Sequence, residues 1–464
     1  MAKQGKKGTS RQVEFTLINP HAGGIDIGSK SHWVGIGPED EHSREFGVFT
    51  EDLHNLCKWV VSNGVTTIAM ESTGFYWKQL FVMLQSYGLE VYLVNASFTK
   101  NVQGKKPSDK ADGRWIWRLH SAGLLPASFQ PDGFTEELRT YVRHRKQLIQ
   151  DASRCVNRMQ KSLTLMNIHL PIVLSDIVGK SGKAIIKSIL GGQRDAKKLA
   201  ALADPRVKAD KATIEKALTG FWRADHLFEL KQSWEMYQSY QAQIKACDEQ
   251  IDTLLQQKVR DTGTAGLEYK AQKKKYRQKN SPTFQVETYA YQLSKGVDLL
   301  EIDGIGFDFV LTLLSEVGMD LKQFPSAKHF VSWLCLCPNK KVSGGKVLSS
   351  KTRKNKQRLR LAFKQAAVAV AKKRDNPLSA FYRRMAARHG KGTAVTATAR
   401  KLAIIVYNML VKGQPYQPED LEKYQQKVRK QKIKHIQSPY VYLIKGLQGK
   451  NVSFKVEKIT NTIP

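Results

Sequence analysis

Four carboxylates occupy positions from which they could act together. Asp26 lies inside a predicted strand, between two isoleucines, where a charge is costly unless it has a partner. Glu71 follows the apolar strand predicted over 65–70, and Asp109 and Asp112 open a predicted helix. Because Asp109 and Asp112 are three residues apart, both side chains leave one face of that helix. If the strands that carry Asp26 and Glu71 are neighbours, the helix can bring all four carboxylates together.

Such a cluster favours a metal-dependent reaction. Clustered carboxylates repel one another, and hard divalent cations with oxygen ligands remove that repulsion. Two Mg²⁺ ions, or Mn²⁺ in their place, would then stabilise the attacking and leaving oxygens of a phosphoryl transfer.

Each carboxylate also has an ordinary explanation. Asp109 and Asp112 would be charges at a helix N-terminus, and Glu71 would be a solvated strand end. Asp26 would be a turn residue ahead of Gly28. Since all these explanations would have to hold at once, the order of the four residues predicts the ribonuclease-H-like plan of metal-dependent nucleases and recombinases.

A serine in the C-terminal third has surroundings suited to a phosphate. Ser343 precedes two glycines, which leave its backbone accessible. The cationic side chains around it are Lys340, Lys341, Lys346, Arg353 and Lys354. Serine is a weak nucleophile unless a base or a metal activates it, and no carboxylate or histidine lies nearby in sequence. Ser343 therefore either contacts a phosphate or is activated from another domain, and Ser349 and Ser350 are weaker candidates because no glycine flanks them.

Further residues suggest contacts with nucleic-acid phosphates. Gly304 and Gly306 form a Gly-x-Gly turn that opens a helix, as in a helix-hairpin-helix, whose backbone amides hold a phosphate without reading sequence. An ordinary turn between helices has the same pattern, and both interpretations stay open. Arg143 and Arg145 lie on the early turns of a long basic helix predicted over 134–169 and are further candidates for nucleic-acid binding.

The elements that must position the carboxylates alternate between strands and helices. We predict strands over 22–28, 32–37, 45–49, 65–70 and 91–94, and helices over 51–63, 75–87 and 108–122. The order is a three-strand meander followed by helix, strand, helix, strand and helix. This order predicts a mixed α/β sheet.

The remainder is predicted to be helical. Long helices over 134–169 and 226–259 suggest an antiparallel or intermolecular coiled coil, although Gln241 and Asp248 place polar residues in its seam. Residues 170–225 look helical but broken, and 260–283 look like a linker. The predicted domains are 1–130 (ribonuclease-H-like), 131–296 (helical spacer and linker), 297–413 (basic helical domain with the serine) and 414–464 (basic peripheral tail).

The charge of the chain points to a polyanionic partner. Of 464 residues, 75 are Lys or Arg and 41 are Asp or Glu, a net charge of +34. Residues 321–418 hold 22 of these cations and one acid, interleaved with apolar stretches, which indicates a folded basic domain. Nucleic acid is the expected partner. An anionic membrane is less favoured, because no apolar run has the length of a spanning helix.

The sequence also argues against several other classes. The five cysteines form no C-x-x-C pair, so zinc and a disulfide framework are not expected. The N-terminus lacks the apolar core of a signal peptide, and we expect a cytoplasmic, nucleoid-associated protein of a bacterium or archaeon. The segment from Ile25 to Lys30 is similar to a phosphate loop of actin-like and sugar-kinase ATPases, but such enzymes need a duplicated second half, which we do not find.

Taken together, these motifs resemble those of the DEDD transposases of insertion sequences, which carry a RuvC-like domain. The resemblance spans about residues 20–413. It rests on Gly-Ile-Asp26-Ile-Gly, Glu71-Ser-Thr-Gly, Ser108-Asp-Lys-Ala-Asp-Gly, Ile302-Asp-Gly-Ile-Gly, Phe324-Pro-Ser-Ala-Lys-His-Phe-Val-Ser-Trp-Leu and Cys337-Pro with Ser343-Gly-Gly-Lys.

The resemblance implies a mechanism. It implies that Asp26, Glu71, Asp109 and Asp112 bind Mg²⁺ and that Ser343 attacks DNA to form a covalent phosphoserine link. It also implies a structured non-coding guide, the bridge RNA, which pairs with target and donor DNA. One subunit's RuvC-like site would meet another subunit's serine domain, in a dimer or a tetramer. The alternatives are a Holliday-junction nuclease that needs only the carboxylates, and a non-catalytic nucleic-acid-binding protein.

This chain departs from compact relatives in its central region. The stretch of about 130 residues between Asn167 and Val297 is longer than theirs, and the tail after Gly413 matches no pattern.

Overall fold

The chain folds into two compact units. The computed structural model describes residues 17–72, 74–100, 109–271, 273, 275–353 and 355–433, with the side chains of Lys100, Asp109 and Lys110 outside the description. The units are 1–130 and 131–464. The predicted domains 1–130, 131–296, 297–413 and 414–464 stay predictions.

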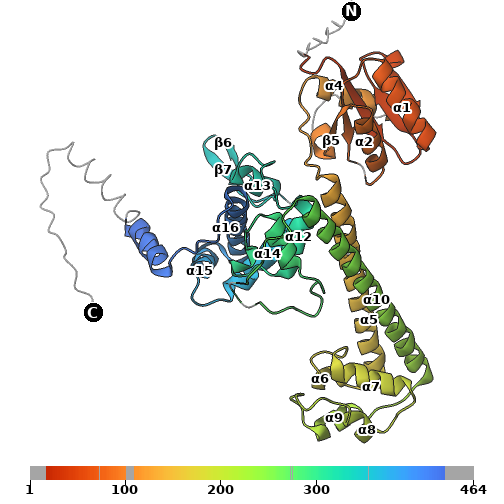
Figure 1. Ribbon diagram of the computed structural model, residues 1–464, viewed down its shortest axis with the longest axis vertical. Helices are drawn as coiled ribbons and strands as arrows, with labels where there is room; N and C mark the ends of the chain where they lie inside the picture. Colours follow the sequence, from red (N-terminus) through yellow and green to blue (C-terminus); the bar gives the residue numbers. More distant parts are fainter. Residues whose placement is uncertain are drawn as a thin grey trace, which may run out of the picture. The chain divides into compact units, whose positions relative to one another are not determined.

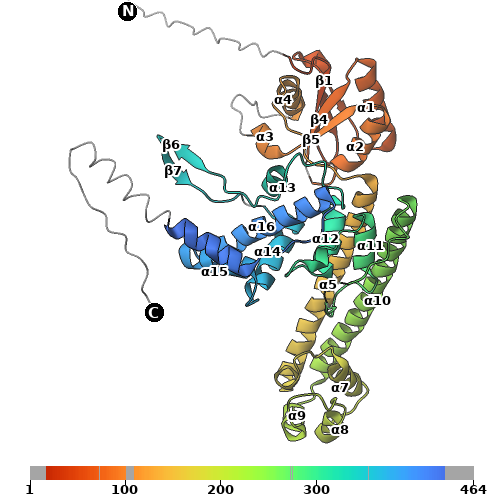
Figure 2. The same ribbon diagram turned by 60° about the vertical axis from the view of Figure 1, so that its left-hand side comes forward.

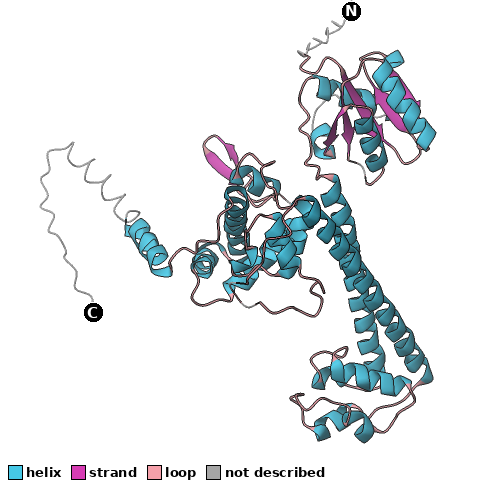
Figure 3. Ribbon diagram, in the orientation of Figure 1, coloured by secondary structure: helices cyan, strands magenta, loops and turns pink. Residues whose placement is uncertain are grey.

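The first unit is built on a five-stranded mixed sheet (Figures 1 and 3). Its strands are β1 (Ala22–Ile27), β2 (His32–Gly35), β3 (Ser43–Phe46), β4 (Thr67–Glu71) and β5 (Glu90–Val94), in the order β3-β2-β1-β4-β5. β1 pairs antiparallel with β2 and parallel with β4, and β4 pairs parallel with β5. The predicted mixed α/β sheet is confirmed, as is the adjacency of the first and fourth strands.

Helices cover both faces of this sheet (Figure 1). α1 (Thr50–Ser62) and α2 (Trp77–Ser86) share one core with the strand residues that point to their side, Ile25 and Ile68 among them. α4 (Asp109–Ser121) covers the other face with a smaller core that includes Ala69 and Ile116. Short helices η1 (Asp40–His42) and α3 (Ala96–Lys100) were not predicted.

Glycines let α4 lie directly on the strands. A Cβ on Gly24 of β1 would lie 2.6 Å from the carbonyl oxygen of Gly113 and closer still to the amide nitrogen of Trp117. A Cβ on Gly113 would in turn lie 2.6 Å from the carbonyl oxygen of Trp33 on β2, and one on Gly35 would lie 2.8 Å from the Cα of Arg114. The helix therefore packs backbone against backbone, at a distance that only glycine permits.

Replacing Gly24 by alanine should push α4 away from the sheet. We expect Gly24→Ala to lower the free energy of unfolding of the first unit by roughly 2 kcal/mol or more, because the neighbouring atoms belong to backbone that cannot rotate aside. Chemical denaturation of the full chain measures the loss. Gly133→Ala is the control, since nothing lies within 4 Å of a Cβ there. Equal midpoints for the two variants would contradict the close approach of α4.

The second unit contains a pair of long antiparallel helices, α5 (Gly133–Leu165) and α10 (Ala224–Asp261) (Figures 1 and 2). Their direction follows from three contacts: the Lys258 ammonium lies over the Phe134 ring, Arg145 pairs with Asp248, and the Ser162 hydroxyl donates to Glu229. The pairing occurs within one chain. Between the far ends of the two helices lie four short helices, α6 (Leu170–Val173), α7 (Lys180–Leu190), α8 (Ala196–Ala200) and α9 (Lys211–Ala217), which share their core.

The polar seam residue Asp248 has a buried partner. Arg145 and Asp248 have side chains that are 5% and 1% exposed, and their ion pair is bidentate. Arg145 also donates to the carbonyl of Asn280 (3.0 Å), and the Asp248 carboxylate accepts from the amide of Thr283 (3.2 Å). The pair therefore joins both long helices to the following loop.

Removing one member of this pair should lower the free energy of unfolding more than removing both members does. Asp248→Asn leaves the Arg145 charge buried without a counter-ion, and we expect a loss of about 3 kcal/mol in the free energy of unfolding. The double variant Arg145→Met/Asp248→Leu should recover at least half of that loss, since it removes the buried charges. A denaturation double-mutant cycle tests this expectation, and strictly additive losses would refute it.

The rest of the second unit is a helical layer with one small hairpin. Its elements are α11 (Val286–Leu293), η2 (Leu299–Glu301), α12 (Phe307–Val317), α13 (Ala327–Trp333), β6 (Lys341–Ser343), β7 (Lys346–Ser349), α14 (Arg358–Ala371), α15 (Pro377–His389), α16 (Lys391–Lys412) and a helix over 421–433. Phe330 lies fully buried at its centre and packs against the rings of Phe324, Trp333, Phe363 and Tyr407. The hairpin and α11 were not predicted.

This layer is fastened to the helix pair. Arg143 on α5 donates to both carboxylate oxygens of Glu316 on α12, at 3.1 and 2.7 Å. Arg139 donates to the Glu316 carbonyl (2.7 Å), and burial lowers the pKa of Arg139. These contacts fasten α12 to α5 within the second unit.

The helix α16 has an apolar composition. By length and hydropathy α16 could cross a membrane, contrary to the expectation that no segment would qualify. α16 instead supplies core residues such as Leu402, Ala403 and Val406, which are fully buried. Its apolar character is explained by packing within the second unit.

Candidate active site and nucleic-acid interface

The sheet brings Asp26 and Glu71 to the same edge. β1 and β4 are parallel, and Ile25 pairs with Met70, so Asp26 and Glu71 are the next residues on neighbouring strands. Both strands reach this edge at their carboxyl ends. Side chains alternate along a strand, so Asp26 projects on the face of Gly24 and Glu71 on the face of Ala69, which is the face that α4 covers.

α4 brings Asp112 to the same place. Asp112 precedes Gly113, whose Cα lies against the carbonyl of Trp33, and Trp33 is the cross-strand partner of Asp26. Asp112 is therefore near the carboxyl end of β1, on the face that holds Asp26. Asp109 is the first residue of α4, one turn earlier, and its side chain lies outside the described part of the structure.

A threonine that the sequence analysis missed orients Glu71. The Thr99 hydroxyl, 1% exposed, donates to Glu71 Oε2 at 2.8 Å. The indole of Trp115 on α4 donates to the Thr99 carbonyl at 3.0 Å. Thr99 belongs to no motif, and only the return of α3 beside β4 brings it to the carboxylate, so no sequence signal could have identified it.

The donor types suit a hard divalent cation, but the described carboxylates do not converge on a metal site. Asp26, Glu71 and Asp112 offer carboxylate oxygens from three elements to one edge of the sheet, and oxygen ligands suit Mg²⁺ and Mn²⁺. Within the part of the chain that the structure describes, no three acidic, histidine or cysteine side chains converge closely enough to hold an ion. The predicted fourth ligand, Asp109, has a side chain outside that part.

A buried histidine lies beneath this face. His120 on α4 is 1% exposed, its Nε2 lies 3.0 Å from the Thr67 hydroxyl, and its ring packs against that of Tyr92. Burial lowers the pKa of His120 to about 4, although nearby Glu90 acts in the opposite direction. His120 is neutral at physiological pH and supports the packing of α4.

The predicted serine lies on an exposed hairpin. β6 and β7 are joined by Gly344 and Gly345, whose φ angles of 52° and 74° are both positive, as in the tight two-residue turns that match strand twist. Ser343 is exposed and pairs across the hairpin with Lys346. Figure 2 shows the hairpin extending away from the helices of its unit.

The two faces of the hairpin differ in chemistry. Ser343 and Lys346 share one face, because directly paired residues project on the same side. Val342 and Val347 share the opposite face and are 57% and 60% exposed. Within the described residues, no hydrogen bond reaches the Ser343 hydroxyl, so a base or metal that activates it must come from elsewhere.

The predicted cations lie around this hairpin. Lys340, Lys341, Lys346 and Arg353 are all exposed, whereas Lys354 lies outside the described residues. At the base of the hairpin a cavity of about 460 Å³ is lined by Thr352, Arg353, Asn355, Lys356 and Arg360. Arg360 donates to the Asn355 carbonyl (2.8 Å) and so holds the base of the hairpin in place. Lys356 and Arg360 are cationic residues that the sequence analysis missed.

Two other predicted residues are bound to acidic side chains. Arg145 is bound bidentately to buried Asp248, so its guanidinium is not available to a phosphate. Arg143 is bound to Glu316 with a side chain that is 43% exposed. Basic spacing alone did not reveal that these arginines have acidic partners far away in sequence.

The glycine turn is well formed. Gly304 has φ 86°. A Cβ there would lie 2.4 Å from the carbonyl oxygen of Ala366 on α14, and a backbone atom cannot rotate aside, so the turn packs tightly on that helix. Gly306 caps α12 and has open space around it. Lys275 donates to the Ile305 carbonyl (3.0 Å), so the predicted linker over 260–283 is anchored to the turn.

Comparison with protein families matches two parts of the chain. A family model for DEDD transposases of the IS110 type matches residues 23–168, and one for the transposase IS116/IS110/IS902 family matches residues 298–383. The mixed sheet and the two matches define a transposase, an enzyme that cuts and joins DNA. The chain belongs to the IS110 family of insertion-sequence transposases. A search of curated proteins finds no match.

The matched regions contain the candidate residues. Asp26, Glu71 and Asp112 lie within the first match, and Ser343 lies within the second. The residues between the matches, 169–297, include the short helices α6–α9 and all of α10. Domains of the DEDD type generally use divalent metal ions.

The buried histidine predicts a pH dependence. The unfolded chain takes up a proton on His120 near pH 6.5, whereas the folded chain does so only near pH 4. The free energy of unfolding should therefore fall as the pH is lowered through this window, by about 3 kcal/mol in total from this residue. His120→Asn should be less stable than the parent chain at pH 7, and the difference should shrink toward pH 4. A difference that is constant with pH would contradict a neutral buried His120.

Proposed function

We propose that this transposase exchanges DNA strands of its own element through Ser343, with metal ions held by Asp26, Glu71, Asp109 and Asp112. The observation that carries the proposal is the common edge and face of the sheet to which β1, β4 and α4 bring Asp26, Glu71 and Asp112. Mg²⁺, with Mn²⁺ as the alternative, would supply charge stabilisation for a phosphoryl transfer there.

The chain's own residues would have separate tasks. Thr99 holds one oxygen of Glu71, which fixes the orientation of that carboxylate. Lys346, the cross-strand neighbour of Ser343, places a positive charge beside the phosphate that the serine would attack. In that attack the Ser343 oxygen gives its proton to a base and forms a bond to phosphorus, the bond from phosphorus to one DNA sugar oxygen breaks, and that oxygen takes up a proton and leaves as a DNA hydroxyl.

The covalent link would preserve the energy of the broken bond. A phosphoserine diester differs little in free energy from the DNA diester it replaces, so a second DNA hydroxyl can reverse the reaction onto a new strand without an external energy source. Because no hydrogen bond reaches the Ser343 hydroxyl within the described residues of its unit, we propose that the carboxylate site of another subunit completes the reaction centre. This arrangement requires a dimer at least, and a tetramer for two pairs of strands.

We further propose that a structured non-coding RNA chooses the DNA sequences. The basic charge of residues 321–418 supports a nucleic-acid partner, and the resemblance to bridge-RNA-guided recombinases supports an RNA. Target and donor DNA would pair with that RNA. A cytoplasmic location beside the nucleoid follows from this function.

Trapping the covalent intermediate tests the mechanism. The chain is expressed with its native flanking DNA, and protein–DNA adducts are resolved on denaturing gels. The parent chain and the hairpin control Ser350→Ala should both form an adduct. Ser343→Ala should form none, and Asp26→Asn should reduce the adduct and strand exchange by at least about 100-fold, because a catalytic group is removed.

The outcomes separate the proposal from its alternatives. Strand cleavage that survives in Ser343→Ala but not in Asp26→Asn would replace the serine mechanism by a Holliday-junction nuclease that uses the carboxylates alone. Cleavage by neither variant nor parent, with nucleic-acid binding intact, would indicate a non-catalytic binding protein. Sequencing of the co-purified RNA tests guidance: one discrete species encoded beside the gene supports it, and a mixture of unrelated RNAs refutes it.

A further inference from the structure

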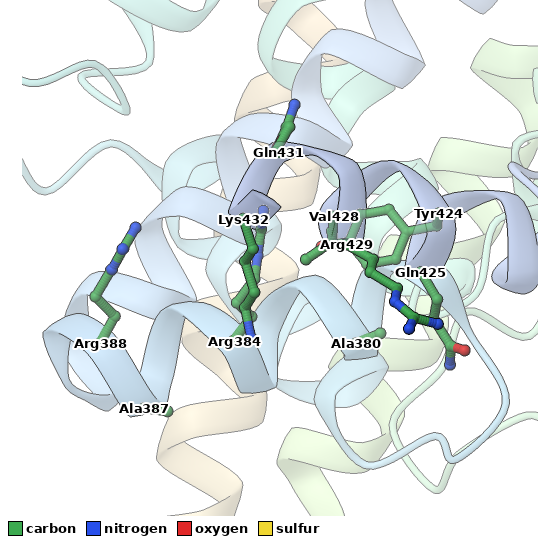
Figure 4. A pocket seen from close by; sticks show the side chains of 10 residues that line it. All are labelled: Ala380, Arg384, Ala387, Arg388, Tyr424, Gln425, Val428, Arg429, Gln431 and Lys432. Carbon is green, nitrogen blue, oxygen red and sulfur yellow. The ribbon is translucent and has the colours of Figure 1, made fainter. Parts of the chain in front are cut away.

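A second basic surface is formed mostly by residues that neither family model matches. α15 and the helix over 421–433 enclose a groove of about 830 Å³ (Figure 4). Its lining residues are Ala380, Arg384, Ala387, Arg388, Tyr424, Gln425, Val428, Arg429, Gln431 and Lys432. The hairpin with Ser343 contributes none of them.

The groove combines a small apolar floor with cationic walls. Ala380, Ala387 and Val428 have short side chains, so a bulky ligand can approach the helix backbones. Arg384 and Arg388 are four residues apart on α15 and therefore project on one face. Arg429 and Lys432 are three residues apart on the facing helix and do the same.

These four cations have no acidic partner among the described residues. Within the described residues, none of Arg384, Arg388, Arg429 and Lys432 forms an ion pair, and all four side chains are exposed. Glu419, which precedes the second helix, pairs instead with Lys401 (3.4 Å) and Lys427 (3.8 Å), outside the groove. Four positive charges that line one groove attract an anion.

The aromatic residue of the groove argues for recognition of a backbone rather than of bases. Tyr424 is 6% exposed, and its ring is already contacted by the Arg384 guanidinium (5.7 Å) and the Lys401 ammonium (5.2 Å). A base therefore has no free aromatic face on which to stack, as single-stranded nucleic acid would require. Exposed Arg and Lys side chains suit the phosphates of a duplex.

The segment that follows the second helix has the same sign of charge as the groove. Residues 434–464, which follow the second helix, contain five lysines and one glutamate, so like charges would meet. The duplex DNA that a transposase must hold carries the complementary charge.

We propose that the groove between α15 and the helix over 421–433 binds the phosphate backbone of duplex DNA without reading its sequence. It would hold DNA that flanks the exchanged strands. The inference rests on DNA binding by the family and not on serine chemistry, so it can fail or hold independently of the proposed reaction.

A charge-matched pair of variants tests the groove. Arg429→Gln/Lys432→Gln removes two lining cations, and Lys423→Gln/Lys430→Gln removes two exposed cations of the same helix that do not line it. Full-length protein is titrated with short duplex DNAs of two unrelated sequences over a range of salt. We expect the groove variant to bind both duplexes roughly 10-fold more weakly at about 0.1 M salt and to lower the salt slope by about 2.

The control variant decides between a site and general attraction. It should change the affinity by less than about 3-fold, and the groove variant should still form the covalent adduct at saturating protein. Equal effects of the two variants, or no effect of either, would overturn the proposal. A loss confined to one DNA sequence would overturn the claim that the groove reads only the backbone.

Cross-linking locates the nucleic acid directly. A photoreactive residue is placed at Gln425, which lines the groove, or at its exposed neighbour Gln426, which does not. Cross-links from Gln425 to duplex DNA, and few from Gln426, are expected. Cross-links from Gln425 to RNA in place of DNA, or equal yields from both positions, would contradict the proposal.

Discussion

The candidate carboxylate site depends on the contact between the backbone of α4 and the backbones of β1 and β2. Gly24, Gly35 and Gly113 make this contact, and each would clash if it carried a Cβ. The contact fixes how far α4 lies from the sheet and where along the strands it lies. Since Asp112 precedes Gly113, the same packing that stabilises the first unit also sets the position of a candidate metal ligand beside Asp26.

Charge has opposite roles in the second unit. In its interior, Arg145 and Asp248 form a buried pair that joins the long helices, and the half-exposed Arg143 fastens the helical layer to them through Glu316. A buried pair such as that of Arg145 and Asp248 is costly to form and costlier to break. On the surface, exposed cations that form no ion pair within the described residues gather around the hairpin and along α15, where we propose that a nucleic acid supplies the counter-charge.

The reaction groups differ in how rigidly they are held. Glu71 is buried and bonded to Thr99, and a position fixed in advance favours charge stabilisation in a reaction. Ser343 stands on a two-stranded hairpin with exposed valines on its other face, and two strands alone are marginally stable in water. This difference fits a fixed carboxylate site that receives a serine delivered by a separate element, as the proposed exchange between subunits requires.

Local pattern determined the mixed sheet, the long helices and the identity of the candidate residues, because alternation, helix-stop glycines and short motifs are properties of neighbouring residues. Tertiary structure alone decided the rest. Arg145 resembled a phosphate-binding residue until Asp248, far away in sequence, proved to be its buried partner. Thr99 has no motif, and the residues of β6 and β7 read as a loop. Partners brought together by folding leave no local signal, which is the physical reason that the sequence did not reveal them.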